Sequence, residues 1–126
     1  MTTYYRTALT AVGPDVADLL DGGILILFAD GAPPELAEVS VLHRVEEGPT
    51  AEAPPVGARI TVGGLTATMT AIGEYAWAKI GDMGHVVINF DGGTESNRPG
   101  EISASAVEAP DLLAAVVPGA ILTISA

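Results

Sequence analysis

The apolar segments of this chain are all short, because a glycine or a proline interrupts each of them. The 126 residues include 15 glycines and 9 prolines, and the longest apolar run, residues 23–29, has the length of a single strand. A membrane-spanning helix needs about 20 consecutive apolar residues, so no membrane insertion is expected. The sequence therefore predicts a single domain, residues 1–126, built mainly from short strands.

The expected strands alternate with a few helical turns. Strands are expected at 3–12, 24–28, 39–45, 58–62, 65–72, 85–90, 102–107 and 121–124, and helical turns at 14–20, 32–37, 75–80 and 110–116. The segment 24–28 is apolar throughout, which predicts a strand buried on both faces. Gly63-Gly64 is typical of a two-residue hairpin, since glycine tolerates positive φ. Few lysines are available to protect strand edges, so we expect an all-β fold that closes into a small barrel.

Three segments recur about half the chain apart. The segment LTAVG at 9–13 resembles MTAIG at 69–73, an offset of 60 residues. The segments 24–28 and 57–62 resemble 86–90 and 119–124, an offset of 62 residues. These likenesses predict an internal duplication, with two similar halves, 1–62 and 63–126, forming one barrel about a pseudo-twofold axis. Chance similarity in a chain rich in Ala, Val, Gly and Thr is the alternative.

The charge and the cysteine content exclude several classes of protein. There are 16 Asp and Glu against 5 Lys and Arg, a formal net charge of −11. Phosphate backbones and anionic membrane surfaces would repel such a chain, so nucleic-acid binding is not expected. Cysteine is absent, which excludes disulfides and thiol nucleophiles and fits a reducing cytoplasm. The N-terminal residues also lack the pattern of a signal peptide.

The two histidines are the natural candidates for a nucleophile or a general acid/base near neutral pH. At an offset of 62 residues, His43 aligns with Ser105 and His85 aligns with Gly23. Each imidazole therefore belongs to one half of the repeat only.

The environment of His43 suits a neutral imidazole. In a strand, His43 shares a face with Val41 and Val45, and partial desolvation there favours the neutral, nucleophilic form. The alternative is a structural histidine that binds a backbone carbonyl, and spacing alone favours that alternative. His85 opens the strand 85–90, where it could orient His43 or hydrogen-bond a transferred group; the alternative, a capped residue at the strand end, is favoured by spacing alone.

No other pattern points to chemistry. Carboxylates such as Asp82 and Asp91 lack the spacing of a metal site, and neither a phosphate-binding glycine loop nor a nucleophilic serine motif occurs. We therefore expect no metal and no cofactor. Arg44 is expected on the strand face opposite His43.

The segment FADGAPPEL at 28–36, followed by VLH at 41–43, resembles the glucitol/sorbitol-specific enzyme IIA component of the bacterial phosphotransferase system (PTS). The likeness continues through IG at 72–73, GHVVINFDG at 84–92 and PG at 99–100, in the same order. It covers essentially the whole chain, and the family fold is a small β-barrel.

The resemblance implies a cytoplasmic phosphocarrier. Such proteins accept a phosphoryl group on histidine from phosphorylated HPr and pass it to the IIB component; the membrane permease IIC then couples the transfer to uptake and phosphorylation of glucitol/sorbitol or a related hexitol. The family's phospho-accepting histidine falls at His43, and the GHV segment makes His85 a candidate supporting residue. The acidic chain then suits a partner with a basic surface.

Two other functions stay open at this point. The chain could be a non-enzymatic β-barrel that binds a small ligand or a protein, with both histidines structural. It could also be a IIA-like regulatory domain that is phosphorylated as a signal rather than for transport.

Overall fold

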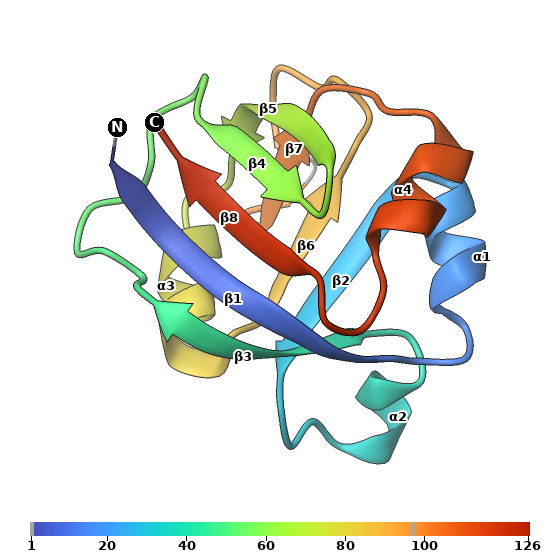
Figure 1. Cartoon of the computed structure of the whole chain (residues 1–126). Coiled ribbons are helices and arrows are strands. Elements are labelled where there is room, and N and C mark those ends of the chain that lie inside the picture. Colours follow the sequence, from blue (N-terminus) through green and yellow to red (C-terminus); the bar gives the residue numbers. More distant parts are fainter. Residues whose placement is uncertain (1, 97) are drawn as a thin grey trace.

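A computed structural model describes residues 2–96 and 98–126, and within them eight strands close into a barrel (Figure 1). The strands are β1 (Thr3–Val12), β2 (Ile24–Ala29), β3 (Val41–Glu47), β4 (Arg59–Val62), β5 (Leu65–Ile72), β6 (Val86–Asn89), β7 (Glu101–Ala104) and β8 (Ile121–Ser125). The helices are α1 (Val16–Asp21), α2 (Pro34–Ala37), α3 (Ala76–Met83) and α4 (Ala109–Ala115). The order around the barrel is β1-β3-β2-β6-β7-β5-β4-β8, which confirms the predicted closed all-β fold.

Each of the predicted strands and helical turns occurs, with boundaries that move by a few residues. Helix α1 begins at Val16 rather than at 14, and β7 ends at Ala104 rather than at 107. Strand β3 runs from Val41 to Glu47 rather than from 39 to 45. In the hairpin between β4 and β5, only Gly63 has a positive φ, of 57°.

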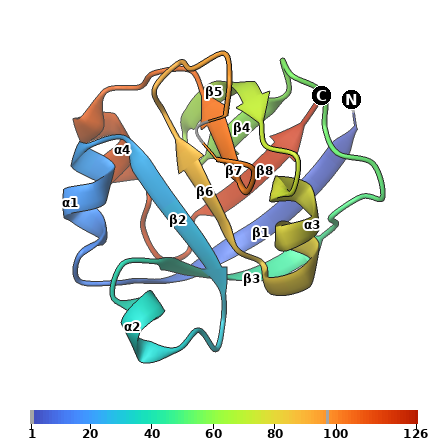
Figure 2. The same cartoon turned by 180° about the vertical axis from the view of Figure 1, so that it is seen from behind.

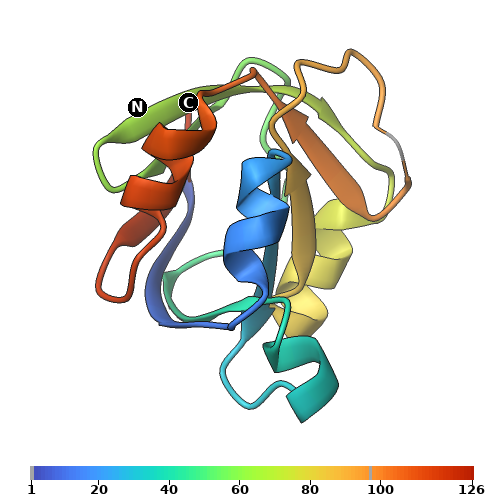
Figure 3. The same ribbon diagram turned by 90° about the vertical axis from the view of Figure 1, so that its right-hand side faces the viewer.

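The helices cover only part of the barrel. Helix α1 packs against α4 and β2, and α3 packs against β6 (Figure 3). Seen from behind, β2 and β6 run side by side with no helix in front of them (Figure 2).

The prediction that segment 24–28 is buried on both faces is wrong. Leu25 and Leu27 point into the core, with exposed fractions of 0% and 1%, whereas Ile26 and Phe28 are half-exposed on the outer face. A continuous apolar run reads the same whether its outer face is covered or open, so the sequence could not separate the two cases.

Strand pairing is the same in the two halves of the chain. Strand β1 pairs antiparallel with β3 as β5 does with β7, and β2 pairs parallel with β3 as β6 does with β7. Strand β1 also pairs with β8 as β5 pairs with β4. In the pairs β2–β6 and β4–β8, a strand lies beside its own equivalent from the other half. This topology has a pseudo-twofold axis, while an origin by duplication stays a prediction.

The strand register shows that the 62-residue offset aligns His43 with the wrong residue of the second half. Strand β1 has an irregularity between Leu9 and Ala11, and β5 has one at the equivalent place, between Met69 and Ala71. Leu9 pairs with His43 and Met69 pairs with Ala104. His43 therefore corresponds to Ala104, not to Ser105, because the sequence offset cannot follow a change of loop length between strands.

The same correction applies to His85. Leu27 pairs with Val41, and Ile88 pairs with Ile102 at the corresponding place in the second half. His85 is therefore equivalent to Ile24, and Gly84 rather than His85 is equivalent to Gly23. Both glycines have positive φ, 60° and 79°, at the ends of α3 and α1. Each histidine still belongs to one half only.

Candidate functional site

His43 lies on β3 with its side chain inside the barrel. Its exposed fraction is 1%, and it shares the inner face with Val41, as predicted. Val45, two residues further on, is 39% exposed. The neighbouring Arg44 is exposed, as expected for a residue on the opposite face.

Both ring nitrogens of His43 have hydrogen-bond partners. The Nε2 atom lies 2.6 Å from the carbonyl oxygen of Gly84, and Nδ1 lies 2.6 Å from the Thr7 hydroxyl. A carbonyl can only accept, so Nε2 carries the proton and donates it to Gly84. The remaining nitrogen, Nδ1, then holds the lone pair and accepts from the Thr7 O–H. The surroundings therefore select one tautomer of the neutral ring.

Burial is the main influence on the charge of His43. It lowers the pKa of the imidazole below its usual value, while the bond to Gly84 and the negative charge of Asp30 act in the opposite direction. The ring is therefore neutral at pH 7, as the sequence predicted.

Aromatic side chains surround the ring on one side. Tyr5 meets it edge-on with ring centroids 6.3 Å apart, and Trp77 of α3 meets Tyr5 at 6.1 Å. The Tyr5 hydroxyl is buried and is one of the side-chain atoms without a hydrogen-bond partner in the described part of the chain. Burial raises the pKa of Tyr5 to about 12, so this hydroxyl stays protonated.

Gly84 is required where it is for steric reasons. It ends α3 with a φ of 60°, and a Cβ at this position would lie 2.8 Å from the Cβ of Ala29. The close approach of this backbone to β2 is what brings the Gly84 carbonyl to the His43 ring.

Sequence reasoning missed both partners of His43. Thr7 is one of several threonines in the chain, and only the pairing of β1 with β3 reveals its position. The Gly84 carbonyl is a backbone group without any side-chain signature. The GHV segment at 84–86, which matches the family, pointed to His85 rather than to Gly84.

The structure does not place the two imidazoles on the same face. His85 is half-exposed, its ring lies 5.0 Å from that of Phe28 on the outer face, and its Nδ1 lies 3.0 Å from the Leu27 carbonyl oxygen. The backbone of Gly84 contacts the His43 ring from the inside, and the next residue, His85, turns outward.

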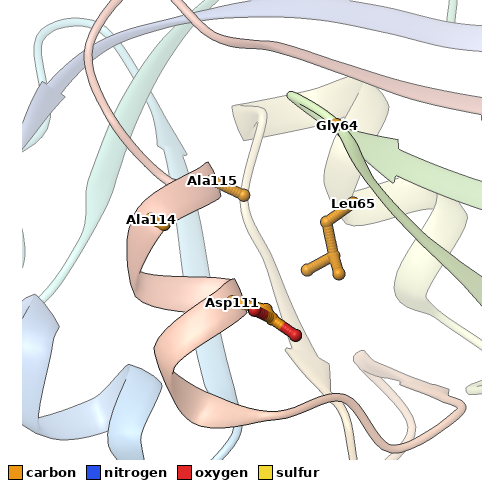
Figure 4. A pocket seen from close by; sticks show the side chains of 5 residues that line it. All are labelled: Gly64, Leu65, Asp111, Ala114 and Ala115. Atoms are coloured by element: carbon orange, nitrogen blue, oxygen red, sulfur yellow. The ribbon is translucent and has the colours of Figure 1, made fainter.

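Other surface pockets are lined by few side chains that could take part in a reaction. One of about 350 Å³ lies between the β4–β5 hairpin and α4 and has Asp111 as its only charged lining residue (Figure 4). Among residues 2–96 and 98–126, no group of three or more His, Asp or Glu side chains could hold a metal ion.

Comparisons with known proteins agree with this barrel fold. The family model of the PTS glucitol/sorbitol-specific IIA component matches residues 4–117. The chain belongs to this family. The glucitol/sorbitol-specific EIIA components of Shigella flexneri and Escherichia coli (strain K12) are each 34% identical to it over 122 residues, which cover 97% of this chain and 94% of each relative.

A solved structure shows the same fold. The PTS system IIA component from Enterococcus faecalis V583 is 15% identical, covers 96% of this chain and 99% of its own, and superposes with a TM-score of 0.75. Among the described residues of the IIA chain, no helix is both long enough and apolar enough to cross a membrane. Family membership makes the chain a PTS phosphocarrier whose partners are other PTS components.

Proposed function

We propose that this IIA component accepts a phosphoryl group from phosphorylated HPr on His43 and passes it to the IIB component in the cytoplasm. The IIC permease would then use it for uptake and phosphorylation of glucitol/sorbitol or a related hexitol. The family match supports the system and the carrier role. The observation that supports His43 is its buried, neutral imidazole with a selected tautomer.

The chemistry follows from this tautomer. The Nδ1 lone pair is the nucleophile, and it attacks the phosphorus atom of the donor phosphohistidine while the donor's P–N bond breaks. The ring gains positive charge as the new bond forms, and the Gly84 carbonyl, which accepts the Nε2–H, stabilises that charge. Transfer to the IIB component is the reverse of this step with a new acceptor.

The closed site sets one condition for transfer. Because the His43 ring is 1% exposed and Thr7 occupies Nδ1, the Thr7 hydroxyl must turn away and the ring must become accessible when a partner docks. The proposal therefore includes an opening step that precedes the chemistry.

Stabilisation of the phosphoryl charge falls largely to the partner. The chain has 5 Lys and Arg in all, and Arg44, next to His43 in sequence, lies on the opposite face. A basic partner would complement the net charge of −11 and would speed encounter more than it tightens binding.

The test is reconstitution with phosphoenolpyruvate, enzyme I, HPr and the IIB component. Wild-type protein should gain an acid-labile phosphoryl group on residue 43, and His43→Gln should lower onward transfer to IIB by more than about 1,000-fold. Arg44→Ala is the matched control, because it changes the adjacent residue on the other face; its rate should stay within about threefold of wild type.

Two results would count against the proposal. A folded wild-type protein that takes no phosphoryl group would exclude the phosphocarrier role and would favour a ligand-binding barrel. Onward transfer at the wild-type rate in His43→Gln would exclude His43 as the carrier.

A further inference from the structure

No helix lies in front of β2 and β6 in Figure 2, and the side chains on their outer face are apolar. Ile26 pairs with Val87 across the two strands, Phe28 pairs with Leu42 on β3, and all four side chains are half-exposed. His85 lies on this face against the Phe28 ring. We call these five residues the outer apolar face.

His85 is held on this face in a defined orientation. Its Nδ1 lies 3.0 Å from the Leu27 carbonyl oxygen, which can only accept, so Nδ1 carries the proton. The lone pair of the neutral ring is then on Nε2. Within residues 2–96 and 98–126, Nε2 has no hydrogen-bond partner, and the side chain is half-exposed. This is the reverse of His43, whose two nitrogens are both occupied inside the barrel.

The surroundings of His85 favour a basic protein as the occupant of this face. Asp30 directly follows β2, Asp82 lies in α3 three residues before His85, and Glu35 and Glu38 lie in and after α2; all four are exposed. An apolar surface on strands whose adjoining segments carry exposed carboxylates matches a partner that has an apolar centre and a basic rim.

We propose that Nε2 of His85 is a second phosphoryl acceptor of this chain, which phosphorylated HPr reaches without any opening of the barrel. The inference rests on the proposed function for its donor, and it adds an acceptor that the resemblance to the family did not assign. It places the first encounter with the donor on the outer apolar face.

The proposed step balances without a further reactant. The Nε2 lone pair forms a bond to the phosphorus atom, the P–N bond of the donor phosphohistidine breaks, and its electron pair returns to the donor ring nitrogen. The proton on Nδ1 stays in place, and the Leu27 carbonyl stabilises the positive charge that develops on the ring. When a partner covers Phe28 and its apolar neighbours, water is excluded from the phosphoryl group.

The experiment uses His85→Asn and the full chain. The Asn amide can replace Nδ1–H as the donor to Leu27 but carries nothing in place of Nε2. With phosphoenolpyruvate, enzyme I and HPr, peptide mapping under alkaline conditions should locate a phosphoryl group on residue 85 in wild type and in His43→Gln. The initial rate of labelling should fall at least about tenfold in His85→Asn.

The outcomes separate this inference from the proposed function. If the wild-type protein is labelled on residue 43 alone and His85→Asn is labelled at the wild-type rate, the inference is overturned and the phosphocarrier role stands. If the folded wild-type protein takes no label, both fail.

A second measurement does not depend on the folding of a variant. Diethyl pyrocarbonate acylates accessible neutral imidazoles, so in native wild-type protein it should modify His85 at least about tenfold faster than His43, whose exposed fraction is 1%. Faster modification of His43 would contradict the assignment.

Discussion

The two halves of the barrel share one strand pairing but differ at the site. In the first half, Thr7 on β1 and His43 on β3 are joined by a side-chain hydrogen bond, and both are buried with exposed fractions of 0% and 1%. The equivalent residues of the second half are Ala67 and Ala104, at 4% and 0%. The same backbone is therefore built with alanine at these places. The buried hydrogen-bonded pair is not something that the fold requires, which supports a functional reason for it.

The two halves also differ in what the carbonyl groups of the equivalent glycines, Gly23 and Gly84, bind. The Gly23 carbonyl accepts a backbone hydrogen bond from Phe90 at 2.8 Å, and the Gly84 carbonyl accepts from the His43 ring at 2.6 Å. The Gly23 carbonyl thus links the start of β2 to the end of β6, whereas the Gly84 carbonyl orients the imidazole of His43.

The largest difference between the halves is expected from alanine at the two glycines. Gly84→Ala places a Cβ 2.8 Å from that of Ala29 at positive φ, whereas at Gly23 the nearest atom, the Phe90 oxygen, is 3.4 Å away. Strain from positive φ costs about 1–3 kcal/mol at both, and overpacking adds about 1–3 kcal/mol at Gly84 only. Chemical denaturation should therefore show the larger loss for Gly84→Ala. Equal losses of stability in the two variants would mean that the close contact between residue 84 and Ala29 does not contribute to the destabilisation.

The Thr7–His43 pair should show coupling that its alanine counterpart lacks. In a double-mutant cycle of Thr7→Ala and His43→Ala, the interaction energy from denaturation should be about 1–2 kcal/mol, because each single variant leaves one buried partner unsatisfied. The control cycle combines His43→Ala with Thr66→Ala, an exposed threonine of β5, and should be additive. If the destabilisations were additive in both cycles, the hydrogen bond between Thr7 and His43 would not contribute to stability.

Stability should depend on pH through His43. Its pKa is lowered in the folded state, so the unfolded chain, in which the pKa of His43 is about 6.5, takes up a proton first as the pH falls. The stabilisation is fully present above the unfolded pKa and is lost between it and the folded pKa, by up to about 1.4 kcal/mol per pH unit. Denaturation at about pH 7.5 and about pH 5.5 measures this loss, which should be smaller in His43→Gln. The same slope in both proteins would assign the effect to other groups.

The smallest effect is expected at Tyr5. The repeat makes it equivalent to the apolar Leu65, and its buried hydroxyl has no partner in the described part of the chain. Tyr5→Phe should leave thermal stability unchanged or raise it by up to about 1 kcal/mol, since an unsatisfied buried hydroxyl is removed. A clear loss of stability would show that the hydroxyl is bonded in solution.

The strands, the closure and the inward position of His43 could be predicted because each depends on local patterns. Glycine and proline limit the length of the elements, and the alternation around His43 places it on the same face as Val41. The neutral charge state follows from that burial.

The partners of His43 could not be predicted in the same way. Thr7 and Gly84 lie far from His43 in sequence and meet it only through the strand register and the end of α3. The outer position of His85 depends on which side of β6 stays uncovered, and an apolar run carries no such information.

Because the strands close into a barrel, the first and last strands are neighbours, and the two ends of the chain lie side by side. Thr2 and Ala126 exchange two backbone hydrogen bonds, of 2.6 and 2.9 Å, at the β1–β8 junction. The β4–β5 hairpin at Gly63 is the twofold equivalent of that junction. A circularly permuted chain, joined at 126–1 and reopened at 63–64, would run through β5 to β8 and then β1 to β4 with every strand pair retained. The half that carries His43 and Thr7 would then be synthesised second instead of first.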